Sequence, residues 1–249
     1  MFLVLEKIEN MQIEEKQTIA SIVRENYKTA EIFSKHKIDF CCGGKKSVGE
    51  ACANSSVDFA QISKELDEIC VEMSSENEYS NWESSKLIDY ILENHHVYVK
   101  ESVPYLSQLL SKIADVHGEN HPELLEVRDI YEEATGALWE HMENEELVVF
   151  PAIKVMEEAN KKGEEIPPMG FGNVNNSIAI MEEEHDFEGV SFKKIAALTH
   201  DFTPPEDACN TYTVAFAKLK EFVADLHQHI HLENNVLFEN AKTLEAGFK

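Results

Sequence analysis

Two stretches of the sequence carry a histidine followed four residues later by a glutamate: His141 with Glu145, and His229 with Glu233. The pattern Leu-x-x-His-x-x-x-Glu-x-x-Val-x-Phe describes both stretches position by position. Side chains four residues apart project from the same face of an α-helix. Because imidazole nitrogens and carboxylate oxygens are common ligands of transition metals, each stretch offers two ligands to a metal centre, with the carboxylates able to bridge two ions.

Two further histidines, His96 and His185, interrupt apolar stripes of helical period. The four histidines are separated by 45, 44 and 44 residues, which suits ligands that meet at one level of an antiparallel bundle. Without partners, each buried polar group would cost roughly 1–3 kcal/mol and a carboxylate far more. A metal centre removes that cost, and a buried hydrogen-bond network is the alternative. We favour the metal, with six ligands: His96, His141, Glu145, His185, His229 and Glu233.

The types of these ligands predict the metal. Four imidazoles and two carboxylates suit iron, with manganese as a substitute. Structural zinc sites prefer four ligands that include thiolates, so zinc fits this set less well. The sequence therefore favours a non-haem iron site over a zinc site.

Neighbouring residues leave two alternatives to this ligand set. His95 precedes His96, but the line through His95 is polar, so we favour His96 and expect His95 beside the ligands or on the surface. Glu93 and Glu182 each lie three residues before a candidate histidine, as in ferritin-like di-iron sites. A site built on those glutamates leaves two buried histidines without a role, so we rank it second. Three other polar neighbours are expected on the surface: Glu184, His227 and His231.

A separate group of reactive side chains lies in Asp39-Phe40-Cys41-Cys42-Gly43-Gly44. Adjacent cysteines cannot bridge to each other without straining the peptide link between them, so we expect two thiols in a glycine-containing turn. Such thiolates could bind iron, take up a nitrosyl group or pair across a homodimer. The alternative is two small buried side chains. The remaining cysteines are expected in the core: Cys52, Cys70 and Cys209.

The elements that must position these residues are helices. Residues 1–73 carry two helical patterns and predict a small helical N-terminal domain, and the polar stretch 74–83 predicts a linker. Pro104 is expected to kink the first long helix, and Thr203-Pro204-Pro205-Glu206 is typical of a helix start. Short connections predict an all-α protein with an up-down-up-down four-helix bundle over residues 84–245. Its helices are expected at residues 84–113, 121–160, 175–198 and 203–242.

The composition limits the partners of the protein. Among 249 residues, Asp and Glu outnumber Lys and Arg by 47 to 22, which gives a formal charge of −25. Such a surface repels phosphate backbones and anionic lipids, so neither nucleic acid nor a membrane is an expected partner. No stretch approaches the roughly 18 apolar residues of a membrane span. Five unevenly placed cysteines do not form a secreted disulfide framework, and we expect a cytoplasmic location.

The segments that carry these residues resemble one known family. His-Met-x-x-Glu-Glu at 141–146, Met-Glu-x-Glu-His-Asp at 181–186 and His-Ile-x-Leu-Glu-Asn-Asn-Val-Leu-Phe at 229–238 resemble those of a hemerythrin-like di-iron bundle. Combined with the Cys-Cys-Gly-Gly segment, nearly the whole chain resembles the repair-of-iron-centres proteins, the ScdA/YtfE/DnrN group. Oxygen-carrying hemerythrins use five histidines and lack the cysteine module, so oxygen carriage is not expected.

This resemblance implies two iron ions, bridged by oxo or hydroxo groups and by carboxylates, on the six residues named above. It implies that the protein restores iron–sulfur clusters damaged by nitric oxide or peroxide, with the damaged proteins as its partners. The resemblance also gives Cys41 and Cys42 a redox or iron-transfer role. We expect an iron donor more than a turnover enzyme. The alternatives are a nitric oxide reductase, an oxygen-activating enzyme, or a sensor of nitric oxide or redox state.

Overall fold

The computed structural model describes residues 13–71, 79–167 and 172–247, and these residues form helices without a β-strand. The all-α prediction is therefore confirmed. The chain divides into two compact units between Asn81 and Trp82, within the stretch that the sequence predicts as a linker. Residues 74–78 of that stretch lie outside the described residues. Among the described helices, none combines the length and apolar character needed to cross a membrane.

The first unit is made of short helices with well-defined caps. The Thr18 side chain accepts a hydrogen bond from the backbone N–H of Ser21, and Ser47 and Glu50 form a reciprocal capping box. Ile22 and Phe33 are fully buried and contribute to its core. The two predicted helical patterns correspond to α1, α2 and α4, whereas α3 was not predicted. The elements of this unit are α1 (Ile19–Glu25), α2 (Thr29–Lys35), η1 (Gly43–Lys45), α3 (Val48–Ser55), α4 (Phe59–Val71) and η2 (Tyr79–Asn81).

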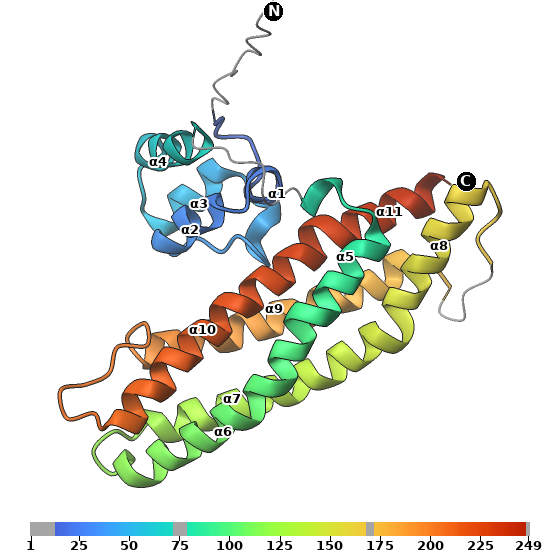
Figure 1. The fold of residues 1–249 in the computed structure, drawn as a ribbon. Helices are drawn as coiled ribbons and strands as arrows, with labels where there is room; N and C mark the ends of the chain where they lie inside the picture. The colour runs from blue at the N-terminus through green and yellow to red at the C-terminus, as the bar shows by residue number, and fades with distance from the viewer. Residues whose placement is uncertain (1–12, 72–78, 168–171, 248–249) are drawn as a thin grey trace, which may run out of the picture. The chain divides into compact units, whose positions relative to one another are not determined.

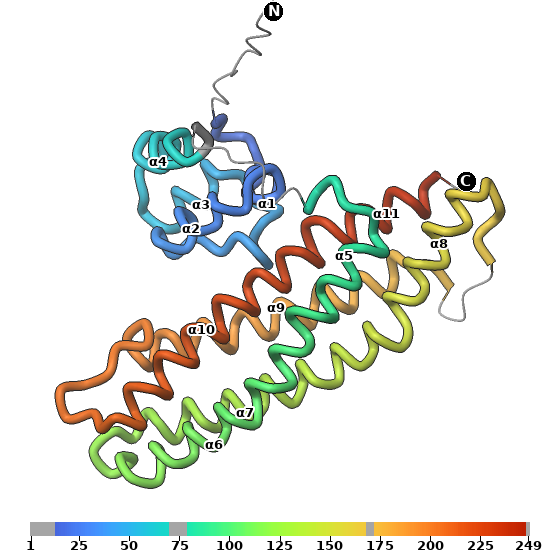
Figure 2. The backbone as a smooth tube through the Cα atoms, in the orientation of Figure 1, coloured from blue at the N-terminus to red at the C-terminus, as the bar shows by residue number. Residues whose placement is uncertain are grey.

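The second unit is an antiparallel bundle of four long helical rods (Figures 1 and 2). The α6 segment packs against α7 and α10, α7 also packs against α9, and α9 contacts α10 and α11. This arrangement confirms the predicted up-down-up-down order. The rods are α5–η3–α6 (Ser84–Tyr90, Ile91–His96, Val97–His117), α7–η4–α8 (Glu123–Asn144, Glu145–Val149, Phe150–Lys162), α9 (Val174–Leu198) and α10–η5–α11 (Asn210–Leu232, Glu233–Leu237, Phe238–Gly247).

The ends of the long helices are capped in ordinary ways, but one predicted helix start differs from the structure. Gly163 ends α8 in the left-handed region at φ 66°, and the Asn173 side chain caps α9. The predicted start of the last helix at Thr203 is wrong, because α10 begins at Asn210. Cys209 adopts an extended conformation there, so the turn around the two prolines is separated from the helix.

Three of the four rods contain a π-helical segment, and these are η3, η4 and η5. A π turn holds an extra residue, so the buried face moves by about one position after it. Regular helical steps from Glu145 predict a buried stripe through Val148 and Val155, and this prediction is wrong. Within and after η4 both side chains are exposed, whereas Val149, Ile153 and Met156 are buried. The α6 helix continues through Pro104, and the irregularity of that rod lies upstream, in η3.

Candidate metal centre

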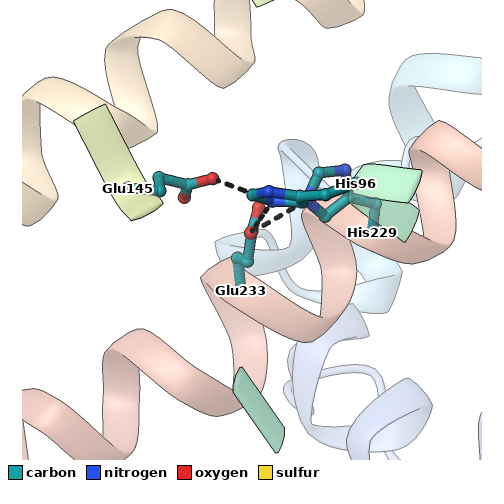
Figure 3. A group of neighbouring side chains, drawn as sticks. All are labelled: His96, Glu145, His229 and Glu233. Atoms are coloured by element: carbon teal, nitrogen blue, oxygen red, sulfur yellow. Dashed lines mark hydrogen bonds and ion pairs between the residues drawn. The ribbon is translucent and has the colours of Figure 1, made fainter. Parts of the chain in front are cut away.

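The six predicted ligands lie together inside the bundle in two overlapping groups. His96, Glu145, His229 and Glu233 form the first group, which is drawn in Figure 3. His141, Glu145, His185 and Glu233 form the second. Within each group, one ligand atom from each residue lies within 4.8 Å of the others, and all six residues are at most 2% exposed. Each group therefore combines two imidazoles with the same two carboxylates, as two adjacent metal ions require.

Each shared carboxylate directs one oxygen to each group. Oε2 of Glu145 lies 3.4 Å from Nε2 of His96, and its Oε1 lies 3.4 Å from Nε2 of His141. Oε1 of Glu233 lies 2.9 Å from Nε2 of His229, and its Oε2 lies 3.2 Å from Nε2 of His185. Each carboxylate thus presents a different oxygen to each group. The one-turn spacing of His229 and Glu233 places both side chains on the same side of the rod, as Figure 3 shows.

Several of these buried atoms have no hydrogen-bond partner among the described residues. They are Nε2 of His96 and His141, both carboxylate oxygens of Glu145, and Oε2 of Glu233. Leaving such atoms unpaired in a protein interior is costly, whereas a cation placed among them would supply the missing partners. The mixture of imidazole nitrogen and carboxylate oxygen suits iron or manganese. The residues present therefore fit a metal centre.

The outer nitrogens of the histidines are held by other side chains. Nδ1 of His96 lies 2.8 Å from Oε1 of Glu146, which also accepts a hydrogen bond from Lys100. Nδ1 of His141 lies 2.8 Å from Oε2 of Glu184. A second nitrogen fixed in this way orients the ring and keeps Nε2 free for a metal.

The remaining two histidines are oriented differently from each other. Nδ1 of His185 lies 2.9 Å from Oδ1 of Asn234. Nδ1 of His229 has no hydrogen-bond partner among the described residues, and the His229 ring stacks on the ring of His95 at a centroid distance of 5.4 Å. Three rings are thus fixed by hydrogen bonds, and the fourth by stacking.

The carboxylates control the protonation of the histidines. Burial lowers the pKa of His96, but Glu145 and Glu233 outweigh it and raise the pKa to about 10. Burial likewise opposes protonation of His141, and Glu145 still raises its pKa well above the usual value. For His229 burial prevails and its pKa is lowered. Protons on His96 and His141 therefore balance the two carboxylates, and a metal cation must displace those protons when it binds.

The structure places the alternative ligands outside both groups. His95 is buried, and its Nδ1 lies 3.0 Å from Asp225, away from the shared carboxylates. Glu93 is exposed, and Glu182 pairs with Lys242 at 3.0 Å. The ferritin-like arrangement therefore has no geometric support among the described residues.

Of the residues expected on the surface, His231 is placed wrongly. The Glu184 side chain is 44% exposed, but it also contacts Nδ1 of His141, as described above. His231 is 1% exposed, and its Nδ1 lies 3.0 Å from the Asn235 side-chain nitrogen. Residues 229–238 are buried on every side of the rod, so the two-faced pattern that places His231 on the surface does not apply there. His227 is half-buried.

Sequence reasoning missed three residues that act on this centre: Glu146, Glu188 and Asn234. Glu146 and Asn234 each directly follow a candidate ligand glutamate, and this position is the only sequence feature that could have identified them. Glu188 was missed because a four-residue step from His185 leads to Gly189 as the expected buried position, whereas the structure buries position 188. Burial raises the pKa of Glu188 to about 7.

The cysteine turn of the first unit forms a separate group with Asp39. Oδ1 of Asp39 accepts hydrogen bonds from the backbone N–H of Cys41 at 3.1 Å and of Cys42 at 3.0 Å. The two Sγ atoms lie 3.7 Å apart, with Cys41 buried and Cys42 half-buried. A hydrogen bond with Cys42, and then burial, raise the pKa of the Cys41 thiol. A Cβ at position 43 would lie 3.2 Å from Cβ of Asp39, so glycine is favoured there.

The remaining cysteines differ from one another. Cys52 is buried, as predicted. The prediction for Cys209 is wrong, because this residue is exposed at the start of α10, with its Sγ 3.2 Å from Nε2 of His117. That histidine, and then the backbone N–H of Tyr212, lower the pKa of Cys209 to about 7. The side chain of Cys70 lies outside the described residues.

A four-helix bundle with two His/Glu groups that share their carboxylates defines a class of metal-binding protein. Residues 87–241 match the family model of the hemerythrin HHE cation binding domain. Residues 15–69 match ScdA_N, a domain of unknown function (DUF542). The bundle is thus a hemerythrin-like cation-binding domain, and the preceding unit carries a second family signature.

Similarity over most of the chain identifies the family more narrowly. The chain is 31% identical over 226 residues to the iron-sulfur cluster repair protein ScdA of Staphylococcus haemolyticus, which covers 91% of this chain and 98% of that protein. It is 33% identical over 219 residues to the iron-sulfur cluster repair protein YtfE of Yersinia pseudotuberculosis, with 86% and 91% covered. The chain therefore belongs to the ScdA/YtfE family of iron–sulfur cluster repair proteins, as its motifs predict.

Proposed function

We propose that this protein repairs damaged iron–sulfur clusters by donating iron from a two-iron centre held by the six residues His96, His141, Glu145, His185, His229 and Glu233. The observation that carries the proposal is the pair of buried His/Glu groups that share two carboxylates with unpartnered oxygens. The relatives that share both domains are named for iron–sulfur cluster repair. Damaged iron–sulfur proteins are accordingly the proposed partners.

The ligand chemistry suits release of the cargo. Bound iron would supply an ion that exchanges ligands and changes oxidation state. Imidazole and carboxylate hold iron less firmly than the thiolates of an acceptor cluster site do. When iron leaves, His96 and His141 take up protons and balance the charge of Glu145 and Glu233. The centre can therefore release its ions without leaving uncompensated carboxylates in the core.

We assign the cysteine turn a role in handling iron or in redox chemistry. Asp39, Cys41 and Cys42 offer one carboxylate and two sulfur ligands within 4.8 Å of one another. Sulfur ligands are the kind that an iron–sulfur acceptor also provides, so a thiol pair is a chemically reasonable intermediate binding position. Substitution of both cysteines by serine tests this role, because iron would still load into the bundle but transfer to an acceptor would slow.

The proposed function is tested by anaerobic repair of a nitric-oxide-damaged [4Fe–4S] enzyme. We expect the protein, loaded with ⁵⁷Fe, to restore the activity of the enzyme and to leave ⁵⁷Fe in its cluster. The Glu145→Ala, Glu233→Ala variant should do neither. Equal repair by that variant would contradict the proposal. Nitrous oxide in the headspace without transfer of ⁵⁷Fe would instead support the nitric oxide reductase alternative.

A further inference from the structure

One buried carboxylate of the bundle has no evident structural purpose. Glu188 is 1% exposed, and neither of its oxygens has a hydrogen-bond partner among the described residues. Glu157, the other buried glutamate outside the ligand set, shows how this fold satisfies such a group. It accepts hydrogen bonds from the backbone N–H of Ser84 at 2.6 Å and of Ser85 at 3.2 Å, and from the Ser85 hydroxyl. Glu188 receives nothing comparable.

The surroundings of Glu188 are the metal centre. It lies one turn after His185 on α9, so both side chains project from the same side of that helix. The charged groups that act on Glu188 are His141, His185, Glu145 and Glu233. These four residues are the members of the second metal-ligand group. Glu188 is not itself part of either group.

Packing alone does not account for a carboxylate at this position. Glutamine has nearly the same shape and carries no charge, and a leucine would extend the apolar stripe. A charge is useful here if a cation lies nearby. Two divalent ions carry four positive charges, whereas Glu145 and Glu233 supply two negative charges, a hydroxo bridge would supply one, and neutral histidines supply none. A third carboxylate reduces the excess positive charge in a medium where water cannot screen it.

We propose that Glu188 is an additional anionic residue of the metal centre, and that its charge retains the metal ion on the side of His141 and His185. The carboxylate acts on the ion from outside the ligand set. The two halves of the centre are then unequal, because the half with His141 and His185 has this additional charge. The inference rests on the proposed two-metal centre and concerns which of its ions is released first.

The charge can be removed with almost no change of shape. In the full-length protein loaded anaerobically with Fe²⁺, release of iron to an excess of a chromogenic chelator is followed in time. We expect wild type to release two ions, and Glu188→Gln to release one of them about ten-fold faster while the other keeps its rate. Glu183→Gln removes the same charge from an exposed position of the same helix and should match wild type.

Three outcomes are distinguishable. Release from Glu188→Gln that is identical to wild type overturns the inference, although the two-iron centre still stands. Equal acceleration of both ions, with a lower melting temperature, also overturns it, because Glu188 would then be a structural residue. Binding of fewer than two ions by wild type refutes the proposed centre itself. If Glu188→Gln does not fold, Glu188→Asp keeps the charge, and wild-type-like release of both ions is then expected.

Discussion

The two groups of metal-binding side chains in this chain differ in how their polar atoms are partnered. In the bundle, three histidines use Nδ1 to contact neighbouring side chains, and the atoms that face the shared carboxylates include several without partners. In the cysteine turn, by contrast, one oxygen of Asp39 already accepts the backbone N–H groups of Cys41 and Cys42. The bundle site thus keeps buried ligand atoms without hydrogen-bond partners among the described residues, whereas Asp39 in the turn already has donors.

This difference suggests a division of labour between storage and handling. A buried site with costly unpaired atoms gains most from a bound ion, so it holds metal firmly. A partly exposed thiol pair that is stable by itself gains less and can bind an ion transiently. We therefore expect an ion to reside long in the bundle and to exchange quickly at the turn, and variants of each site can test this expectation.

The largest expected effect comes from the shared carboxylates. The double variant Glu145→Ala, Glu233→Ala removes both carboxylates that the two groups share. The iron content should therefore fall from roughly two ions per chain to almost none. Cys41→Ser, Cys42→Ser should retain both ions. Iron analysis and Mössbauer spectroscopy provide the measurement, and circular dichroism controls for the fold.

The opposite pattern would reverse the comparison. Iron that survives in the glutamate variant and disappears from the cysteine variant would place the stored metal in the first unit. Iron lost from both variants would mean that the two sites depend on each other for storage.

The ligands were predictable because helical period and chemistry agree at His141, His229 and their partner glutamates. Regular stepping by three and four residues identifies them, and the repeat between the two stretches excludes coincidence. Prediction fails just beyond Glu145, at the π segment η4, where an extra residue in the turn moves the buried face. No sequence pattern marks a π turn. For the same reason Val148 and Val155 were assigned to the wrong face.

Residues that support the ligands were harder to predict, because their role depends on tertiary contacts. Glu184 on α9 contacts His141 on α7, and nothing in the local sequence of Glu184 distinguishes it from an ordinary solvated glutamate. The burial of Glu188 was not predicted, because buried helix positions are normally identified by their apolar residues. Cys209 was misplaced because the predicted start of the last helix lay seven residues too early, which put the thiol inside a helix instead of at its exposed start.

A second test compares thiols in the two units. The hydrogen bond from His117 lowers the pKa of Cys209 to about 7, whereas Cys42 and burial raise the pKa of Cys41. A thiol reacts as its thiolate, so at pH 7 alkylation of Cys209 by iodoacetamide should be at least about fifty-fold faster than that of Cys41. The ratio should shrink as pH rises above 9. Mass spectrometry of peptides across a pH series measures both rates.

The His117→Ala variant provides the matched control for that comparison. Loss of the imidazole should raise the pKa of Cys209 toward an ordinary thiol and slow its alkylation at pH 7, while Cys41 is unaffected. If Cys41 instead reacts as fast as Cys209 in the unaltered protein, the turn is activated without metal, and its assignment to exchange alone would need revision.

A third and smaller effect concerns the side chains that hold the imidazoles. Glu184→Gln keeps a hydrogen-bond acceptor at Nδ1 of His141 but removes its charge, so the affinity of the bundle for Fe²⁺ should fall about ten-fold. Anaerobic competition titration against a chelator of known affinity measures this change. Glu183→Gln, exposed on the same helix, should leave the affinity unaltered, and an equal loss in both variants would attribute the effect to general charge rather than to His141.

The smallest expected effect separates fold stability from metal storage. Glu157 accepts the first backbone N–H groups of α5, so its charge also lies at the positive end of that helix. Burial opposes ionisation, but these hydrogen bonds lower the pKa of Glu157 below its usual value. A lowered carboxyl pKa contributes stability above the unfolded-state pKa, and this contribution is lost as pH falls through the folded-state pKa. Glu157→Gln should therefore cost about 1 kcal/mol in urea unfolding at pH 7, and less as pH falls below about 4. Unchanged iron content in this variant would show that a buried carboxylate with its own donors serves the fold, unlike the unpartnered ones at the centre.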